Sequence, residues 1–245
     1  MATYSSANVG FVLVDGYNLL GYLTTLTANK IKRTEPTTTL GDSWEEHSLT
    51  GLSSFEMMQN GFFDDANDAS NEALLANSAS RTGAIALEGN TAAKKFIGIS
   101  GTIQDEYERI ASVGGLHKAA AAYKANGIIH EAVIIATLAA RALAASPVAS
   151  VDNGAGSTSD NNGAYLQVTV LTLGGWTSIT IKLRSSTDNV TFGDLYTFTT
   201  VTAAPSAQYA TFSSVVNRYV HTTMTGVGAG AGESITFMTG LFRGA

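Results

Sequence analysis

The 245-residue sequence contains no cysteine. A disulfide framework and a zinc site built on thiolates are therefore excluded. Charged residues are also scarce: they make up 14% of the chain, against about a quarter in a typical soluble protein. So much neutral surface suits a chain that is partly covered by neighbouring subunits. A β protein rich in small residues would have the same composition.

Basic residues are fewer than acidic ones, 14 against 20, which gives a net charge of -6. Binding to nucleic acid through its phosphates needs clustered Lys and Arg, so the composition argues against a nucleic-acid-binding protein. The longest largely apolar run, residues 132–145, contains Arg141 and is shorter than the roughly twenty residues of a membrane span. The first residues lack the basic and apolar regions of a signal peptide. We expect no membrane contact.

Residues suited to catalysis or metal binding do not follow a known pattern. The histidines are His47, His117, His130 and His221. No two of them have the spacing of ligands on a helix, so structural or surface roles are favoured. Asp64, Asp65 and Asp68 lack the spacing of a calcium-binding loop and suit a helix N-terminus. We predict that the chain is not an enzyme and has no catalytic, cofactor-binding or metal-binding residues.

The N-terminal half reads as short β runs separated by turn signals. A run at 11–14 ends at Asp15–Gly16, and a second covers 17–26. Residues 29–41 have no apolar period and contain Pro36, which predicts an exposed loop or hairpin tip. Residues 44–49 and 52–63 are predicted to be two strands joined at Thr50–Gly51. A helix is predicted at 66–78, and strands are predicted at 84–87, 95–102, 107–113 and 128–138. The strand at 107–113 is expected to pair with 95–102, and a helix is the alternative for 128–138. Residues 119–125 have helical composition without a clear apolar stripe.

The composition changes at Pro147, and residues 150–163 are rich in Gly, Asn, Asp and Ser. We therefore predict a first domain at 1–146, a linker at 147–163 and a second domain at 164–245. The strand candidates of the second domain are 164–173, 178–185, 191–200, 207–214, 218–226 and 233–243. Their spacing and alternation predict a β-sandwich. The predicted fold class is mainly β: an N-terminal barrel or sandwich domain with one flanking helix, followed by an all-β sandwich.

Two ordered sets of motifs resemble a known family. The opening GFVLVDGYNLLGYL, followed by an acidic stretch with a tryptophan and then by LTGLSSFEMMQNGFFDD, resembles the first domain of tail tube proteins from long, non-contractile-tailed bacteriophages. The segments SITIKLRSSTDNVTFGDLYTFTTVT, VNRYVHTTMTG and SITFMTGLFRG resemble a β module at the C-terminus of two-domain members. That module often has arginine where His221 stands. Residues 80–145 carry the least of the resemblance.

The resemblance implies a structural virion protein of a siphophage tail, assembled in the host cytoplasm, whose rings stack into a tube for DNA ejection. Its implied partners are itself, the tape measure, the tail terminator and the baseplate or distal tail proteins. Double-stranded DNA would pass through without specific binding. A trimeric ring with pseudo-sixfold symmetry is favoured, because residues 146–245 carry little charge for an external decoration. A hexameric ring with the second domain outside is the alternative.

Two groups of residues are the candidate sites for this function. An acidic lumen would repel DNA phosphates, and its candidates are Asp42, Glu45, Glu46 and Glu56. A basic loop with Lys30, Lys32 and Arg33 is the candidate contact between rings. A different function class stays open, in which the C-terminal sandwich is a tail-associated binding or decoration module for carbohydrate or the host surface. Its aromatic platform would have to be built on Trp176 and Trp44.

Overall fold

The computed structural model describes residues 8–36, 47–66, 70–75, 80–111, 115–143, 146–154, 156, 161–228 and 232–244. These residues are mainly antiparallel β-strands with one short helix, which confirms the predicted fold class. The elements of the first half are β1 (Phe11–Val14), β2 (Tyr17–Asn18), β3 (Leu23–Pro36), β4 (His47–Phe62), α1 (Ser70–Leu75), β5 (Arg81–Ala86), β6 (Lys95–Ile110), β7 (Lys118–Ala125) and β8 (Ile129–Arg141). Those of the second half are β9 (Val151–Asp152), β10 (Asn162–Thr172), β11 (Trp176–Ser186), β12 (Gly193–Thr197), β13 (Ser206–Phe212), β14 (Tyr219–Gly228) and β15 (Ser234–Phe242).

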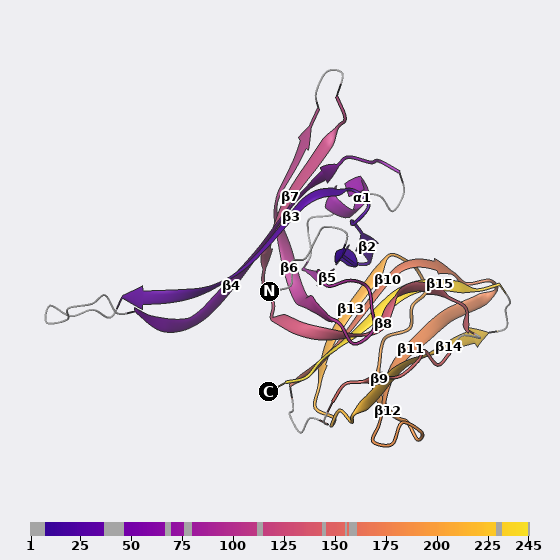
Figure 1. Ribbon diagram of the computed structural model, residues 1–245. Coiled ribbons are helices and arrows are strands. Elements are labelled where there is room, and N and C mark those ends of the chain that lie inside the picture. Colours follow the sequence, from indigo (N-terminus) through magenta and orange to yellow (C-terminus); the bar gives the residue numbers. More distant parts are fainter. Residues whose placement is uncertain are drawn as a thin grey trace, which may run out of the picture.

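The strands form an 11-stranded sheet and a 4-stranded sheet. The main path of the large sheet is β13-β10-β15-β8-β6-β5-β1-β2. A branch leaves β6 through β7 and β4 to β3, and the β3–β4 hairpin projects far from the body as a long arm (Figure 1). The small sheet has the order β12-β11-β14-β9.

The main path of the large sheet curls until its two ends meet, with β10 contacting β2 and β13 contacting β5. At this seam the side chain of Gln167 forms hydrogen bonds that join the two ends of the sheet in place of backbone pairing. Its Oε1 accepts a hydrogen bond from Gly16 N at 2.7 Å, and its Nε2 donates one to Thr82 O at 3.2 Å. Gln167 is fully buried, so these bonds satisfy an amide that would otherwise be costly to desolvate. The result is a barrel-like layer.

The inside of this barrel is filled by large rings facing small residues. Its buried members, here called the barrel core, are Phe11, Leu13, Ala84, Ala86, Phe96, Ala132, Ile134, Tyr165 and Met238. A Cβ added to Gly98 would lie 2.6 Å from Cζ of Tyr165, and one added to Gly240 would lie 2.3 Å from the ring of Phe96. Glycine at these two positions is what lets the aromatic rings cross the strands.

Two further cores lie against the outside of the barrel. The small sheet packs on one side of it, and residues such as Leu166, Ile181 and Phe237 fill that sandwich. The base of the arm, β7 and α1 pack on the other side, around Val12, Phe55, Met57, Ile85 and Tyr123. Barrel strands are therefore buried on both faces. This explains why β1 reads as an uninterrupted apolar run rather than an alternating one.

Several predicted elements are corrected by the structure. Residues 29–36 belong to β3 and are not a loop, because they pair with β4 along the arm. Thr50–Gly51 lies inside the continuous strand β4, so the predicted turn between two strands there is wrong. Residues 107–110 continue β6 and are not the partner of 95–102. Residues 119–125 form a strand, β7. The predicted helix at 66–78 contains α1, while residues 67–69 and 76–79 lie outside the described chain.

The predicted strand at 128–138 and the six C-terminal strands correspond to β8 and to β10–β15. The large sheet runs across the expected domain boundary, because β8 pairs with β15 and β10 pairs with both β15 and β13. The division of the chain into two separate domains with a linker at 147–163 remains a prediction.

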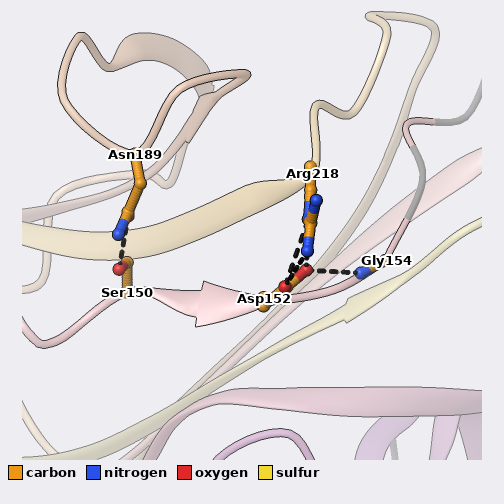
Figure 2. Close-up of polar contacts among 5 residues, drawn as sticks. All are labelled: Ser150, Asp152, Gly154, Asn189 and Arg218. Carbon is orange, nitrogen blue, oxygen red and sulfur yellow. Dashed lines mark hydrogen bonds and ion pairs between the residues drawn. The ribbon is translucent and has the colours of Figure 1, made fainter.

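Part of the expected linker follows the edge of the small sheet. Val148 N donates to Thr222 O at 2.9 Å, and β9 pairs with β14. Figure 2 shows how this strand is fixed: both Arg218 and Gly154 N donate to the carboxylate of Asp152, with Arg218 Nε 2.9 Å from Oδ1. The segment after β8 is thus held against β14 by backbone bonds and an exposed ion pair.

A candidate assembly surface on the open sheet

Four strands extend from the barrel as a sheet with one covered and one open face. This open sheet consists of β3, β4, β7 and residues 103–110 of β6. On its covered face Met57 and Tyr123 are buried. Helix α1 is fastened there, because Gln104 Nε2 donates to Leu74 O at 2.7 Å and Tyr107 OH to Asn71 Oδ1 at 2.9 Å.

The other face carries small and polar side chains, and we call it the open face. Strand registers align its residues in cross-strand rows: Thr27, Met58, Ala122 and Glu106 in one, and Thr25, Asn60, Ala120 and Glu108 in the next. Each of these side chains is exposed or half-buried. Met58, for example, is 54% exposed. Between β4, β7 and β6 the face is hollowed into a shallow groove of about 120 Å³.

The charge of the open face is negative. Glu56, Glu106 and Glu108 are exposed on it together with two lysines: Lys124 faces Glu56 across the β4–β7 pair, and Lys118 lies in the row next to Glu108. Nζ of Lys124 lies 2.6 Å from Asp105 Oδ2, and this hydrogen bond raises the pKa of Lys124. Lys124 is thus already paired with Asp105, and the three glutamates outnumber the other lysine of this face, Lys118.

Both edges of the open sheet lack a strand partner in the described part of the chain. β3 pairs with β4 alone. β6 uses both edges up to Thr102, but residues 103–110 pair with β7 on one side and with no described strand on the other. Unpaired N–H and C=O groups along such edges are a template for pairing with another chain.

The predicted site residues fall into different places. Glu56 lies on the open face, whereas Asp42, Glu45 and Glu46 lie outside the described residues. Lys30 and Lys32 are exposed, but on the opposite face of β3, because Lys30 is in register with Phe55. Arg33 lies in β3, and its side chain is outside the description. The open-face glutamates of β6 were not selected from the sequence, although their i, i+2 spacing was a signal that they share one strand face.

The two histidines with the most buried environments have structural contacts. His130 stacks on Phe242 with ring centroids 4.0 Å apart, and a hydrogen bond of 2.7 Å joins its Nδ1 to Tyr165 OH. His221 stacks on Phe192 at 3.9 Å. Burial lowers the pKa of both rings. Across the described residues, no three His, Asp or Glu side chains gather as a metal site would require.

Comparisons with known proteins give structural similarities only. No family model matches the sequence, and no curated protein matches it. A chain of the virion of a native gene transfer agent particle is 14% identical, covers 52% of this chain and 97% of its own length, and has a TM-score of 0.42. A chain from the tail of an empty gene transfer agent particle, refined helically with C6 symmetry, has the same identity and TM-score, with 53% and 98% covered.

A third similar structure is the Dit protein of SPP1, described as a hub adsorption apparatus in phages that infect Gram-positive bacteria. It is 13% identical, covers 95% of this chain and 98% of its own length, and has a TM-score of 0.34. At such low identities and TM-scores these similarities carry no argument for the function of this chain. Among the residues that the structure describes, no helix has the length and apolar character needed to cross a membrane.

Proposed function

We propose that this chain is a structural virion protein whose rings stack into the tail tube of a siphophage, the conduit for DNA ejection. One observation carries the proposal: among the described residues, the open sheet has two unpaired edges, a covered face and an acidic face that nothing covers. Such a sheet is incomplete in a single subunit. Closing it against neighbouring copies removes its edges and turns the uncovered face into a continuous wall.

The strand directions of the open sheet suit a closed ring. Its four strands alternate in direction, so β3 and the 103–110 stretch of β6 run antiparallel at the two edges. In a cyclic ring, β3 of one copy then meets β6 of the next with the alternation preserved. This contact is heterologous, and it closes when the rotation between copies divides a full turn.

The number of subunits follows from how many open sheets each chain supplies. A trimeric ring with pseudo-sixfold symmetry would need a second open sheet from the C-terminal half. There, β10, β13 and β15 are used by the barrel and the sandwich. The use of these strands within the barrel and the sandwich supports a ring of six copies with the small sheet outside the wall. The sequence alone had favoured a ring of three copies.

The acidic face is proposed to line the lumen. Glu56, Glu106 and Glu108 would repel DNA phosphates, and the alanines between them would leave the wall smooth. Replacing Glu106 and Glu108 together by lysine should slow DNA ejection and leave tube length unchanged. Glu131→Lys, on β8 away from this face, is the matched control. Equal ejection rates for the wild-type protein, the double variant and the Glu131→Lys control would contradict the placement of the acidic face in the lumen.

The remaining parts of the proposal concern location and partners. The chain would assemble in the host cytoplasm and end in the virion, in contact with the tape measure, the tail terminator and the distal tail proteins. The binding-module alternative finds less support. Trp176 is half-buried, and its Nε1 donates to Glu233 Oε2 at 3.4 Å, so it does not stand out as a platform.

The absence of cysteine makes ring closure directly testable. Open-face positions at the two edges, Thr25, Thr27 or Asn29 on one side and Glu106 on the other, can be paired as double cysteine variants. A disulfide forms where the Cβ atoms approach within about 3.5–4.5 Å. Oxidation of assembled protein should give a ladder of covalent oligomers ending at six, while each single variant gives none. An assembled protein in which none of the pairs cross-links would refute closure through these edges.

A further inference from the structure

One loop lies on the outer face of the small sheet, the face that points away from the barrel. This loop, residues 187–192, connects β11 to β12. Its last side chain, Phe192, stacks on His221 of β14 with ring centroids 3.9 Å apart and ring planes 12° from parallel. Val220 and Met224 of the same strand point into the sandwich core, so His221 points to the opposite face. Phe192 therefore covers His221 from outside.

Side-chain contacts attach the 187–192 loop to the sheet on both sides of the stack. Asn189 Oδ1 accepts a hydrogen bond from Ser150 Oγ at 2.6 Å (Figure 2). The guanidinium of Arg184 donates to Phe192 O. Within the loop, the carboxylate of Asp188 accepts hydrogen bonds from two backbone N–H groups, which fixes the turn. The loop is thus an ordered unit that few side chains hold against the sheet.

The surroundings of His221 suit the neutral imidazole. The residue is 6% exposed, and its Nε2 has no hydrogen-bond partner in the described part of the molecule. Arg184 lies opposite His221 in the β11–β14 pair. A protonated ring would place a second positive charge beside Arg184 and leave a buried N–H without an acceptor. This cost outweighs the attraction of a cation for the face of Phe192. Burial, and then the charge of Arg184, lower the pKa of His221 accordingly.

We propose that the stack of Phe192 on His221 is an acid-sensitive contact that holds the 187–192 loop closed at neutral pH and releases it when His221 takes up a proton. The proton comes from solvent, and the charged ring is hydrated only when Phe192 moves off it. The released loop exposes Phe192 close to Val190, which is already 80% exposed. In acid the outer face thus gains an apolar surface beside a positive charge. The contact belongs to the single chain and does not depend on ring assembly.

The other ionisable groups around His221 and the loop keep their charge over the pH range in which His221 titrates. They are Asp188 in the loop, Lys182 and Arg184 on β11, Asp194 on β12, Tyr219 on β14, and Asp152 and Arg218 at the β9 edge. Hydrogen bonds lower the pKa of all three carboxyl groups, that of Asp188 to about 2. Lysine, arginine and tyrosine side chains ordinarily change charge only above about pH 9. Among these groups, His221 is the one whose charge changes between about pH 8 and about pH 4.

Spin labelling of the full chain measures the release, because the sequence contains no cysteine that would compete for the label. A nitroxide on Val190→Cys reports the mobility of the loop in its electron paramagnetic resonance spectrum. The ratio of mobile to immobile label should rise by up to about tenfold for each pH unit below 6.5, the pKa of a hydrated histidine. His221→Gln should abolish this rise. His130→Gln is the matched control, because it removes a histidine of β8 and leaves the stack intact, and it should keep the rise. An unchanged wild-type spectrum, or the same rise in His221→Gln, would overturn the proposal.

Two further measurements separate release of the loop from unfolding of the chain. The far-ultraviolet circular dichroism spectrum should stay constant over the pH range in which the label becomes mobile, and its loss over that range would overturn local release. Nuclear magnetic resonance titration of the His221 ring tests the part played by Phe192. Phe192→Ala should move the midpoint upward toward 6.5, because the ring is then open to water. Equal midpoints in wild type and Phe192→Ala would show that Phe192 does not control the ring, and the proposal would fail.

Discussion

Tyr165 joins strands from both halves of the chain, and its replacement is the sharpest test of the barrel. It is fully buried on β10 and lies against Gly98 of β6. Its ring meets Phe96 edge-on at 5.7 Å, and its hydroxyl is hydrogen-bonded to His130 on β8. Burial raises the pKa of the Tyr165 phenol, so the side chain stays neutral and keeps its proton.

The size of the effect follows from what each substitution removes. Tyr165→Ala deletes a buried ring, which costs about 3–5 kcal/mol. It also leaves the buried His130 Nδ1 without its partner, which adds roughly 1–3 kcal/mol. The sum approaches the whole stability of an ordinary domain, about 5–15 kcal/mol. Tyr165→Phe keeps the ring and should cost only about 1–2 kcal/mol.

Urea unfolding monitored by far-ultraviolet circular dichroism and by tryptophan fluorescence measures both variants. Because the barrel core is shared by the two halves, wild type and Tyr165→Phe should unfold in one transition with coincident midpoints. Tyr165→Ala should lower the midpoint for both signals together. Two separate transitions, of which only one responds to the substitution, would refute the shared barrel and support two independent domains.

Further predictions concern the seam and the pH dependence of stability. Gly16→Ala should cost roughly 1–3 kcal/mol in urea unfolding, because Gly16 has a φ of 87° and an added Cβ would lie 2.4 Å from Ser206 N. The control Gly21→Ala, where a Cβ meets nothing within 4 Å, should change stability by less than about 0.5 kcal/mol. The lowered pKa of His130 means that the unfolded chain binds a proton more readily, so stability should fall as the pH drops below 6.5. His130→Gln should reduce that slope. Hydrogen bonds from Ser186, Thr191 and Val190 lower the pKa of Asp188 to about 2. Its contribution is complete above pH 3.8 and is lost as the pH falls toward 2, a loss that Asp188→Asn should remove.

The sequence predicted those strands in which the alternation of apolar and polar residues matches one buried and one more exposed face. The C-terminal strands alternate clearly because each places one set of side chains in the sandwich core. In β11, for example, Ile179, Ile181 and Leu183 are fully buried. Turn residues mark their ends. These signals are local, so they remain readable without knowing the partner strands.

Elements shaped by distant partners were harder to predict. β7 places Ala119 and Ala121 in the core and Ala120 and Ala122 on the open face. Both faces therefore carry the same residue, and the period of two is hidden. The length of β6 depends on β5, β8 and β7 pairing along it in turn, which no local pattern records. The strand at residues 29–36 was missed for a similar reason: only the base of the arm packs against a core, and this outer part of β3 is polar.

The candidate site was predicted in part. Glu56 was selected as one of the acidic residues expected to line the lumen, and it is exposed on the open face. Glu106 and Glu108 were not selected, because their place on the same face as Glu56 follows from the pairing of β7 with both β4 and β6. The open edges are likewise a property of the sheet order rather than of any residue.

Electron microscopy of the purified 245-residue protein is the most direct test of tube formation. We expect rings that stack into hollow tubes of uniform bore, with the open face lining the channel and the small sheet outside. The same ring should repeat along the tail of virions labelled for this protein. A chain that stays monomeric at every concentration and is absent from tails would contradict tube formation, and so would a single ring that never stacks.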